Sequence, residues 1–186
     1  MGDLTAPIWV SRADGLNLAA RHRPGRADRP ILVFLPGYAS DMQGSKAIAL
    51  DAWAEQTGHA LLRLDYAGCG ESEGAFEDGT LASWRDDARL VIDHLAPGPI
   101  VLIGSSMGGW LALLLARDLG ARVSGMVGIA AAPDFTQWGF SEVEKGLLQQ
   151  QARLLRPSDY GPEPMVTTRA FWHSGQSLCL LDTPIE

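Results

Sequence analysis

Short apolar runs alternate with amphipathic segments between residues 31 and 130 of the chain. Four runs have the length and composition of buried strands and cover residues 31–35, 60–65, 100–103 and 123–130. Segments typical of helices lie between them, at about residues 45–57, 81–95 and 111–119. Strands that alternate with helices predict an α/β fold, a mainly parallel sheet with helices on both faces.

The N-terminal segment has a different pattern, in which two extended stretches flank a turn. Residues 6–12 and 16–23 lie on either side of Asp14-Gly15, a dipeptide typical of the tight turn in a hairpin. We therefore expect a β-hairpin that adds an antiparallel edge to the sheet.

The pattern changes again after Pro133. Ser141 and Glu144 form a capping box before a helix whose apolar positions run to Leu155, and residues 166–181 predict another helix. We expect residues 133–178 to form a lid-like helical insertion within a single domain of residues 1–186, a domain that is incomplete at its C-terminus and lacks its last strands.

Two interpretations of this insertion stay open. It is either a lid over an apolar pocket, to which Phe135, Trp138 and Phe140 would contribute, or ordinary helical packing.

Composition narrows the class of protein. Of the 186 residues, 46% are hydrophobic and 20% are charged, which is typical of a globular chain with a sizeable core. The net charge of −7 argues against nucleic acid or an anionic membrane surface as the main partner. No apolar stretch is long enough to span a bilayer.

The few cysteines and histidines argue against a disulfide-rich secreted protein and against a metal site. Cys69 and Cys179 do not make a disulfide framework, and residues 1–10 lack the pattern of a signal peptide, so we expect a cytoplasmic protein. The four histidines are scattered and no C-x-x-C occurs, so we expect no metal and no cofactor. Cys69 is a candidate reactive thiol, but a buried or loop cysteine explains it as well.

The candidate chemistry follows the strand at residues 100–103. Gly104-Ser105-Ser106-Met107-Gly108 matches G-x-S-x-G and stands between a predicted strand and a predicted helix. In a nucleophile elbow the central serine occupies this sharp turn, at a helix N-terminus that favours an oxyanion. The pattern predicts Ser106 as a nucleophile, whereas Ser105 is not at the central position; an ordinary strand-to-helix turn is the alternative.

Two other strand ends carry glycine-rich loops. Leu35-Pro36-Gly37-Tyr38 ends the first parallel strand, and Asp65-Tyr66-Ala67-Gly68-Cys69-Gly70-Glu71-Ser72 ends the next. In a nucleophile-elbow enzyme the oxyanion hole uses one N–H from the earlier loop and the N–H after the nucleophile. These groups would belong to Tyr38 and Met107. Asp65 is expected to order its own glycine-rich loop.

These three motifs, in this order, resemble those of the α/β-hydrolase superfamily. The runs from Pro36 to Met42 and from Gly104 to Trp110 are similar to a narrower group, which contains a mitochondrial palmitoyl-protein thioesterase and its bacterial relatives. The resemblance implies an ester or thioester hydrolase with a serine nucleophile, acting on a small molecule or an acylated protein.

The family order of a catalytic triad is Ser, then Asp or Glu, then His. We expect both the acid and the base to lie beyond Glu186. His173, the one histidine after Ser106, is the in-chain candidate for the base, but its place beside Trp172 indicates a structural or surface residue. Asp134 and Asp159 would be acids only in a rearranged site.

Alternative functions also stay open. The chain could be a non-catalytic binding module with a hydrolase-like fold, or a peptidase or C–C hydrolase on the same fold, because fold does not determine function.

Overall fold

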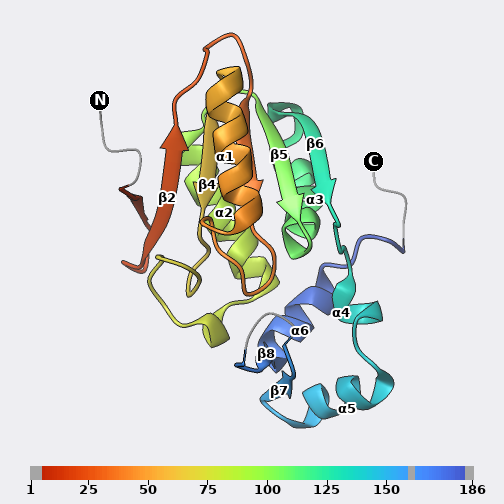
Figure 1. The fold of residues 1–186 in the computed structure, drawn as a ribbon. Helices are drawn as coiled ribbons and strands as arrows, with labels where there is room; N and C mark the ends of the chain where they lie inside the picture. The colour runs from red at the N-terminus through yellow and green to blue at the C-terminus, as the bar shows by residue number, and fades with distance from the viewer. Residues whose placement is uncertain (1–5, 159–161, 183–186) are drawn as a thin grey trace.

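A six-stranded sheet lies at the centre of the part of the chain that the structure describes, residues 6–158 and 162–182 of a computed structural model (Figure 1). Strands β3 (Ile31–Leu35), β4 (Leu61–Leu64), β5 (Ile100–Ser105) and β6 (Val123–Ile129) run parallel in the order β4-β3-β5-β6. The hairpin of β1 (Ile8–Ser11) and β2 (Asn17–Arg23) pairs antiparallel with β4. The predicted mainly parallel sheet with an antiparallel hairpin edge is confirmed.

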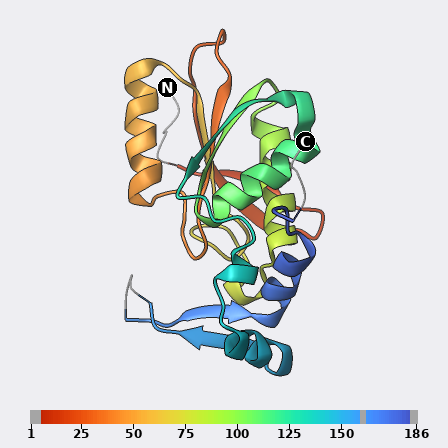
Figure 2. The same ribbon diagram turned by 90° about the vertical axis from the view of Figure 1, so that its right-hand side faces the viewer.

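Helices cover both faces of this sheet. Helix α1 (Ser45–Thr57) lies on one face, and α2 (Leu81–Leu95) and α3 (Met107–Leu119) lie on the other (Figure 2). Because neither face of β3 meets water, four of its five residues are buried, which explains its unbroken apolar run. Helix α2 begins at a capping box between Thr80 and Ser83 and turns Trp84 and Ile92 into the core.

Five short elements lie beyond the carboxyl ends of β5 and β6 (Figure 1). They are α4 (Phe135–Trp138), α5 (Glu142–Gln150), β7 (Arg153–Arg156), β8 (Met165–Thr168) and α6 (Arg169–Ser177). Two 3₁₀ turns, η1 (Phe76–Asp78) and η2 (Gly120–Arg122), complete the described elements.

The prediction that residues 133–178 are helical is wrong in part. Leu154 and Leu155 lie in β7, which pairs antiparallel with β8. Helix α6 begins at Arg169, because the Thr168 side chain accepts the Phe171 N–H and caps the helix there. The β-branched residues before this cap favour extended backbone.

Strand β6 has β5 as its hydrogen-bonded neighbour and forms an edge of the sheet within the described residues. Its apolar sequence predicts an interior strand, yet Met126 is 40% and Val127 is 49% exposed.

None of the described helices is long and apolar enough to cross a membrane. Some predictions fall outside the described residues. They concern Asp159, a candidate acid, residues 1–5 at the N-terminus and residues 183–186 at the C-terminus.

Replacing Gly108 with alanine is expected to destabilise the fold by about 3 kcal/mol, as in strongly overpacked cores. The added Cβ would lie 2.1 Å from the Leu35 carbonyl oxygen, a main-chain atom of the sheet that cannot rotate away. Thermal unfolding followed by circular dichroism measures the change.

Gly146→Ala is the matched control, because Gly146 is also helical but a Cβ there meets nothing within 4 Å. This variant is expected to stabilise α5 by up to about 1 kcal/mol. A melting temperature of Gly108→Ala equal to that of the parent would contradict the close approach of α3 to β3.

Candidate active site

Ser106 occupies a strained turn between β5 and α3. Its backbone has φ 52° and ψ −118°, a conformation that residues with a side chain rarely adopt. The turn is held by main-chain hydrogen bonds, because Ser106 N–H donates to the Ile129 carbonyl at 3.0 Å and Ala132 N–H donates to the Ser106 carbonyl at 3.0 Å. The Ser106 side chain is exposed, at the carboxyl edge of the sheet.

The glycines on either side of Ser106 allow two main-chain segments to approach. A Cβ on Gly104 would lie 2.2 Å from the Gly108 carbonyl oxygen. Any side chain at Gly104 would therefore push α3 away from β5. The neighbouring Ser105 is still part of β5, where it pairs with Ile129 and is buried. The geometry thus presents Ser106 and not Ser105.

The loop after β3 lies directly against Ser106. A Cβ on Gly37 would stand 3.4 Å from the Ser106 Cβ and 3.3 Å from the Ser105 carbonyl oxygen. Among the described residues, neither the Tyr38 N–H nor the Met107 N–H has a hydrogen-bond partner. Met107 is the first residue of α3, where main-chain N–H groups are free of helical bonds. Two unpaired donors therefore belong to segments that adjoin the Ser106 side chain.

The Tyr38 side chain ties this loop to the segment beyond the sheet. Its hydroxyl donates to the Val166 carbonyl of β8 at 2.7 Å. Its ring lies 4.6 Å from that of Phe171 and 6.0 Å from that of Phe135, measured between centroids. Burial raises the pKa of the Tyr38 hydroxyl, so this group stays protonated and remains a donor at neutral pH.

The three aromatic residues predicted to line an apolar pocket divide into two kinds. Phe135 and Phe140 stack on one another, with ring centroids 6.5 Å apart, and Phe135 also contacts Trp110 of α3. Trp138 is 63% exposed, and its indole N–H donates to the Pro133 carbonyl. Phe135 and Phe140 thus pack among other rings, whereas Trp138 lies at the surface.

The structure does not join the candidate bases to Ser106. Within the described residues, which include all four histidines, no imidazole hydrogen-bonds the Ser106 hydroxyl. His173 is exposed on α6 and packs against Trp172. The prediction that the base and the acid lie beyond Glu186 stays a prediction.

Asp134, a candidate acid, binds main-chain N–H groups instead. Its buried carboxylate accepts the N–H groups of Leu180, at 2.9 Å, and of Leu181, at 2.8 Å. The carboxylate therefore joins the start of the 133–178 segment to the residues just after its end.

Cys69 is a poor nucleophile in this environment. Burial raises the pKa of its thiol to about 12, with a smaller contribution from the charge of Asp65. The thiol is protonated at neutral pH, and the thiolate is the reactive form.

One set of contacts was not predicted from the sequence. The Asp65 carboxylate accepts the Glu71 N–H of its own loop, as expected, but it also accepts the Met42 N–H of the loop that carries Tyr38. No local pattern signals a contact between residues that stand 23 positions apart.

The chain is similar over most of its length to known proteins. Residues 32–182 match the alpha/beta hydrolase family. The human mitochondrial palmitoyl-protein thioesterase ABHD10 is 36% identical over 185 residues, which cover 97% of this chain and 60% of that protein. The chain thus spans about 60% of the length of this curated relative.

Two solved structures are similar over nearly the whole chain. A putative hydrolase from Agrobacterium vitis S4 superposes with a TM-score of 0.87 at 40% identity, covering 97% of this chain and 74% of that one. The alpha/beta hydrolase domain-containing protein 10 from mouse superposes with a TM-score of 0.86 at 32% identity, covering 97% and 73%.

The expected cytoplasmic location is contradicted by these comparisons, because the curated ABHD10 relatives are mitochondrial proteins by name. The prediction failed because two unpaired cysteines indicate only a reducing environment, which is not specific to the cytoplasm.

The sheet with its helices, the strained serine turn after β5 and the match over residues 32–182 lead to one conclusion: this chain belongs to the alpha/beta hydrolase family.

Proposed function

We propose that this chain is the catalytic part of a serine hydrolase that cleaves acyl esters or thioesters through an acyl-enzyme on Ser106. The observation that carries the proposal is the strained turn that exposes Ser106 beside two unpaired main-chain donors, Tyr38 N–H and Met107 N–H. The printed name of ABHD10, a palmitoyl-protein thioesterase, supports an acylated substrate, either a protein or a small molecule.

The proposed chemistry has two steps. The Ser106 Oγ attacks the acyl carbonyl carbon while a general base accepts its proton, and the carbonyl oxygen becomes an oxyanion that the Tyr38 and Met107 N–H groups stabilise. Collapse expels the alcohol or thiol, which takes up the proton. Water then cleaves the acyl-enzyme by the same route and releases the carboxylic acid.

Residues 133–178 form a lid over the acyl site in this proposal. Their position beyond the carboxyl ends of β5 and β6 supports it, since ligands of open α/β sheets bind at that edge (Figure 1). The Asp134 carboxylate joins the two ends of the segment, so the lid leaves and rejoins the domain at one place. Tyr38 contacts β8 and α6, so a movement of the lid would change the contacts of the Tyr38 side chain.

A non-catalytic binding module is the second candidate. It is favoured by the absence, within the described residues, of a histidine bonded to Ser106. Labelling with a fluorophosphonate, in a protein extended to carry a complete triad, discriminates the two candidates, because this reagent reacts with activated serines.

Ser106→Ala is expected to abolish fluorophosphonate labelling. In a protein that carries a complete triad, it should lower thioester hydrolysis by about 10⁴-fold or more, as in other serine hydrolases. Mass spectrometry of the labelled peptide and a thioester assay measure these effects. Ser105→Ala is the adjacent control and should retain labelling; comparable turnover by Ser106→Ala and the parent would rule out Ser106 as the nucleophile.

His173→Ala is expected to leave the labelling rate of Ser106 in this chain unchanged, because His173 is exposed on α6 and packs against Trp172. The parent should itself be labelled slowly, since a serine without a base is a weak nucleophile. Time courses of labelling compare the two proteins. If the substitution stopped labelling, His173 would be the catalytic base.

Acyl thioesters should be cleaved faster than peptide amides by a protein with this site and a complete triad. The aromatic residues Phe135, Phe140 and Phe171, close to Tyr38 or to one another, favour an apolar acyl group. A panel of acyl thioesters and peptide amides at equal concentration measures the preference. Faster cleavage of the amides would support the peptidase alternative.

A further inference from the structure

The loop that carries Tyr38 is held at both ends by side chains from the end of β4 and from the two residues that follow it. At its start, the Tyr66 hydroxyl donates to the Pro36 carbonyl at 3.1 Å. Near its end, both polar main-chain groups of Met42 are bound. The Asp65 carboxylate accepts its N–H at 2.7 Å, and the Arg63 guanidinium donates to its carbonyl at 3.1 Å. All three side chains come from residues 63–66, at the carboxyl end of β4.

Asp65 is the most constrained of the three anchors. It is 1% exposed, and its second carboxylate oxygen accepts the Glu71 N–H at 2.9 Å. The main-chain carbonyl of Asp65 accepts the Ser72 hydroxyl at 2.7 Å. A buried carboxylate is stable only when such donors replace its water, and hydrogen bonds to a charged acceptor are stronger than neutral ones. Asp65 therefore joins two loops that are adjacent only in space.

The Tyr38 N–H lies between these anchor points and has no partner of its own among the described residues. The chain reverses next to it, where Ala39 has φ 53° and the Ser40 N–H donates to the Gly37 carbonyl at 3.2 Å. With no bond to hold this N–H directly, its direction depends on the turn around it, on the Tyr38 side chain and on where Pro36 and Met42 are fixed.

We propose that Asp65 is a positioning residue for the oxyanion hole: by holding Met42, its carboxylate keeps the Tyr38 N–H aimed at the oxygen of an acyl group on Ser106. This inference rests on the proposed function, because it assumes that the Tyr38 N–H binds the oxyanion. It extends the role of Asp65 beyond its own glycine-rich loop.

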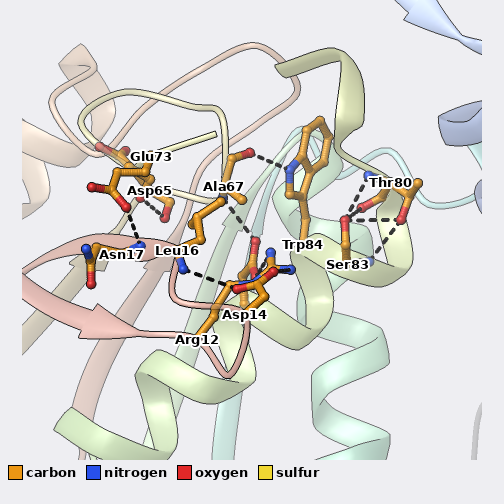
Figure 3. A network of polar contacts seen from close by, with 12 residues as sticks. Arg12, Asp14, Leu16, Asn17, Asp65, Ala67, Glu73, Thr80, Ser83 and Trp84 are labelled. Atoms are coloured by element: carbon orange, nitrogen blue, oxygen red, sulfur yellow. Dashed lines mark hydrogen bonds and ion pairs between the residues drawn. The ribbon is translucent and has the colours of Figure 1, made fainter. Parts of the chain in front are cut away.

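Asp87 provides a matched control for this inference. Its carboxylate is also buried, at 3% exposure, and it also holds the glycine-rich loop, by accepting the Ala67 N–H at 3.0 Å. Its other oxygen pairs with Arg12 at 3.0 Å, and no hydrogen bond joins it to the Tyr38 loop within the described residues. Figure 3 shows how the same loop is further fixed by Trp84, whose indole N–H donates to the Ala67 carbonyl, and by Glu73, which accepts the Asn17 N–H.

The test compares Asp65→Asn with Asp87→Asn, each in a protein that carries a complete triad, in fluorophosphonate inactivation, analysed as a binding constant KI and a rate constant kinact. An asparagine at residue 65 keeps one acceptor but places an NH₂ group against the second N–H donor. Because the phosphoryl oxygen must enter the oxyanion hole, Asp65→Asn should lower kinact by about 10- to 100-fold, the range expected for a misplaced catalytic donor. Its KI should change little, and Asp87→Asn should keep the kinact of the parent.

Hydrogen exchange of the peptide that covers residues 36–44 gives a second, independent result. Exchange there should accelerate in Asp65→Asn and not in Asp87→Asn. Tyr66→Phe, which removes the hydroxyl bonded to Pro36 and nothing else, should lower kinact in the same direction by a smaller factor and serves if Asp65→Asn does not fold.

The outcomes separate this inference from the proposed function. A parent that carries a complete triad and is still not labelled at Ser106 would overturn the proposed function, and exchange would then decide whether Asp65 anchors the loop. If the parent is labelled, two results would overturn the positioning role. In one, Asp65→Asn has the same kinact as the parent; in the other, Asp87→Asn lowers kinact as much as Asp65→Asn does.

Discussion

The close contact between the start of α3 and the end of β3 is the constraint on which the site depends. Gly108 lies so near the Leu35 and Pro36 carbonyl oxygens that a Cβ would stand 2.1 Å and 2.6 Å from them. To place α3 this close to β3 directly after β5, the chain must turn sharply at Ser106, which explains its positive φ. The same contact brings the Tyr38 loop against the serine. Sheet packing and the candidate chemistry therefore have one physical cause.

Local patterns predict the fold well where sequence spacing reflects burial. The apolar run of β3 and the G-x-S-x-G motif after β5 each depend on nearest neighbours in sequence. The sequence wrongly predicts Leu154 and Leu155 in a helix, because their spacing also fits one. Their extended backbone depends on pairing with β8, and Leu155 lies opposite Val166 in that hairpin. Tertiary pairing, which overrides weak local preference, is not visible in a short window.

In the candidate site, too, local motifs are predictable from the sequence and contacts between distant residues are not. Ser106 and the main-chain N–H groups of Tyr38 and Met107 belong to motifs that specify backbone shape, so the sequence predicts where they lie, while their catalytic roles stay predictions. The contact of Asp65 with Met42 and that of Tyr38 with Val166 join residues far apart in the chain, and no local pattern signals them. His173 illustrates the limit of reasoning from residue order, because the one histidine after Ser106 faces solvent on α6.

The structure of the fluorophosphonate adduct tests the central claim most directly, because it shows where the oxyanion would lie. The account predicts that phosphorus is bonded to the Ser106 Oγ and that the phosphoryl oxygen lies about 2.7–3.1 Å from both the Tyr38 and the Met107 nitrogen atoms. A phosphoryl oxygen that points to solvent, or an adduct on Ser105 or Cys69, would contradict it.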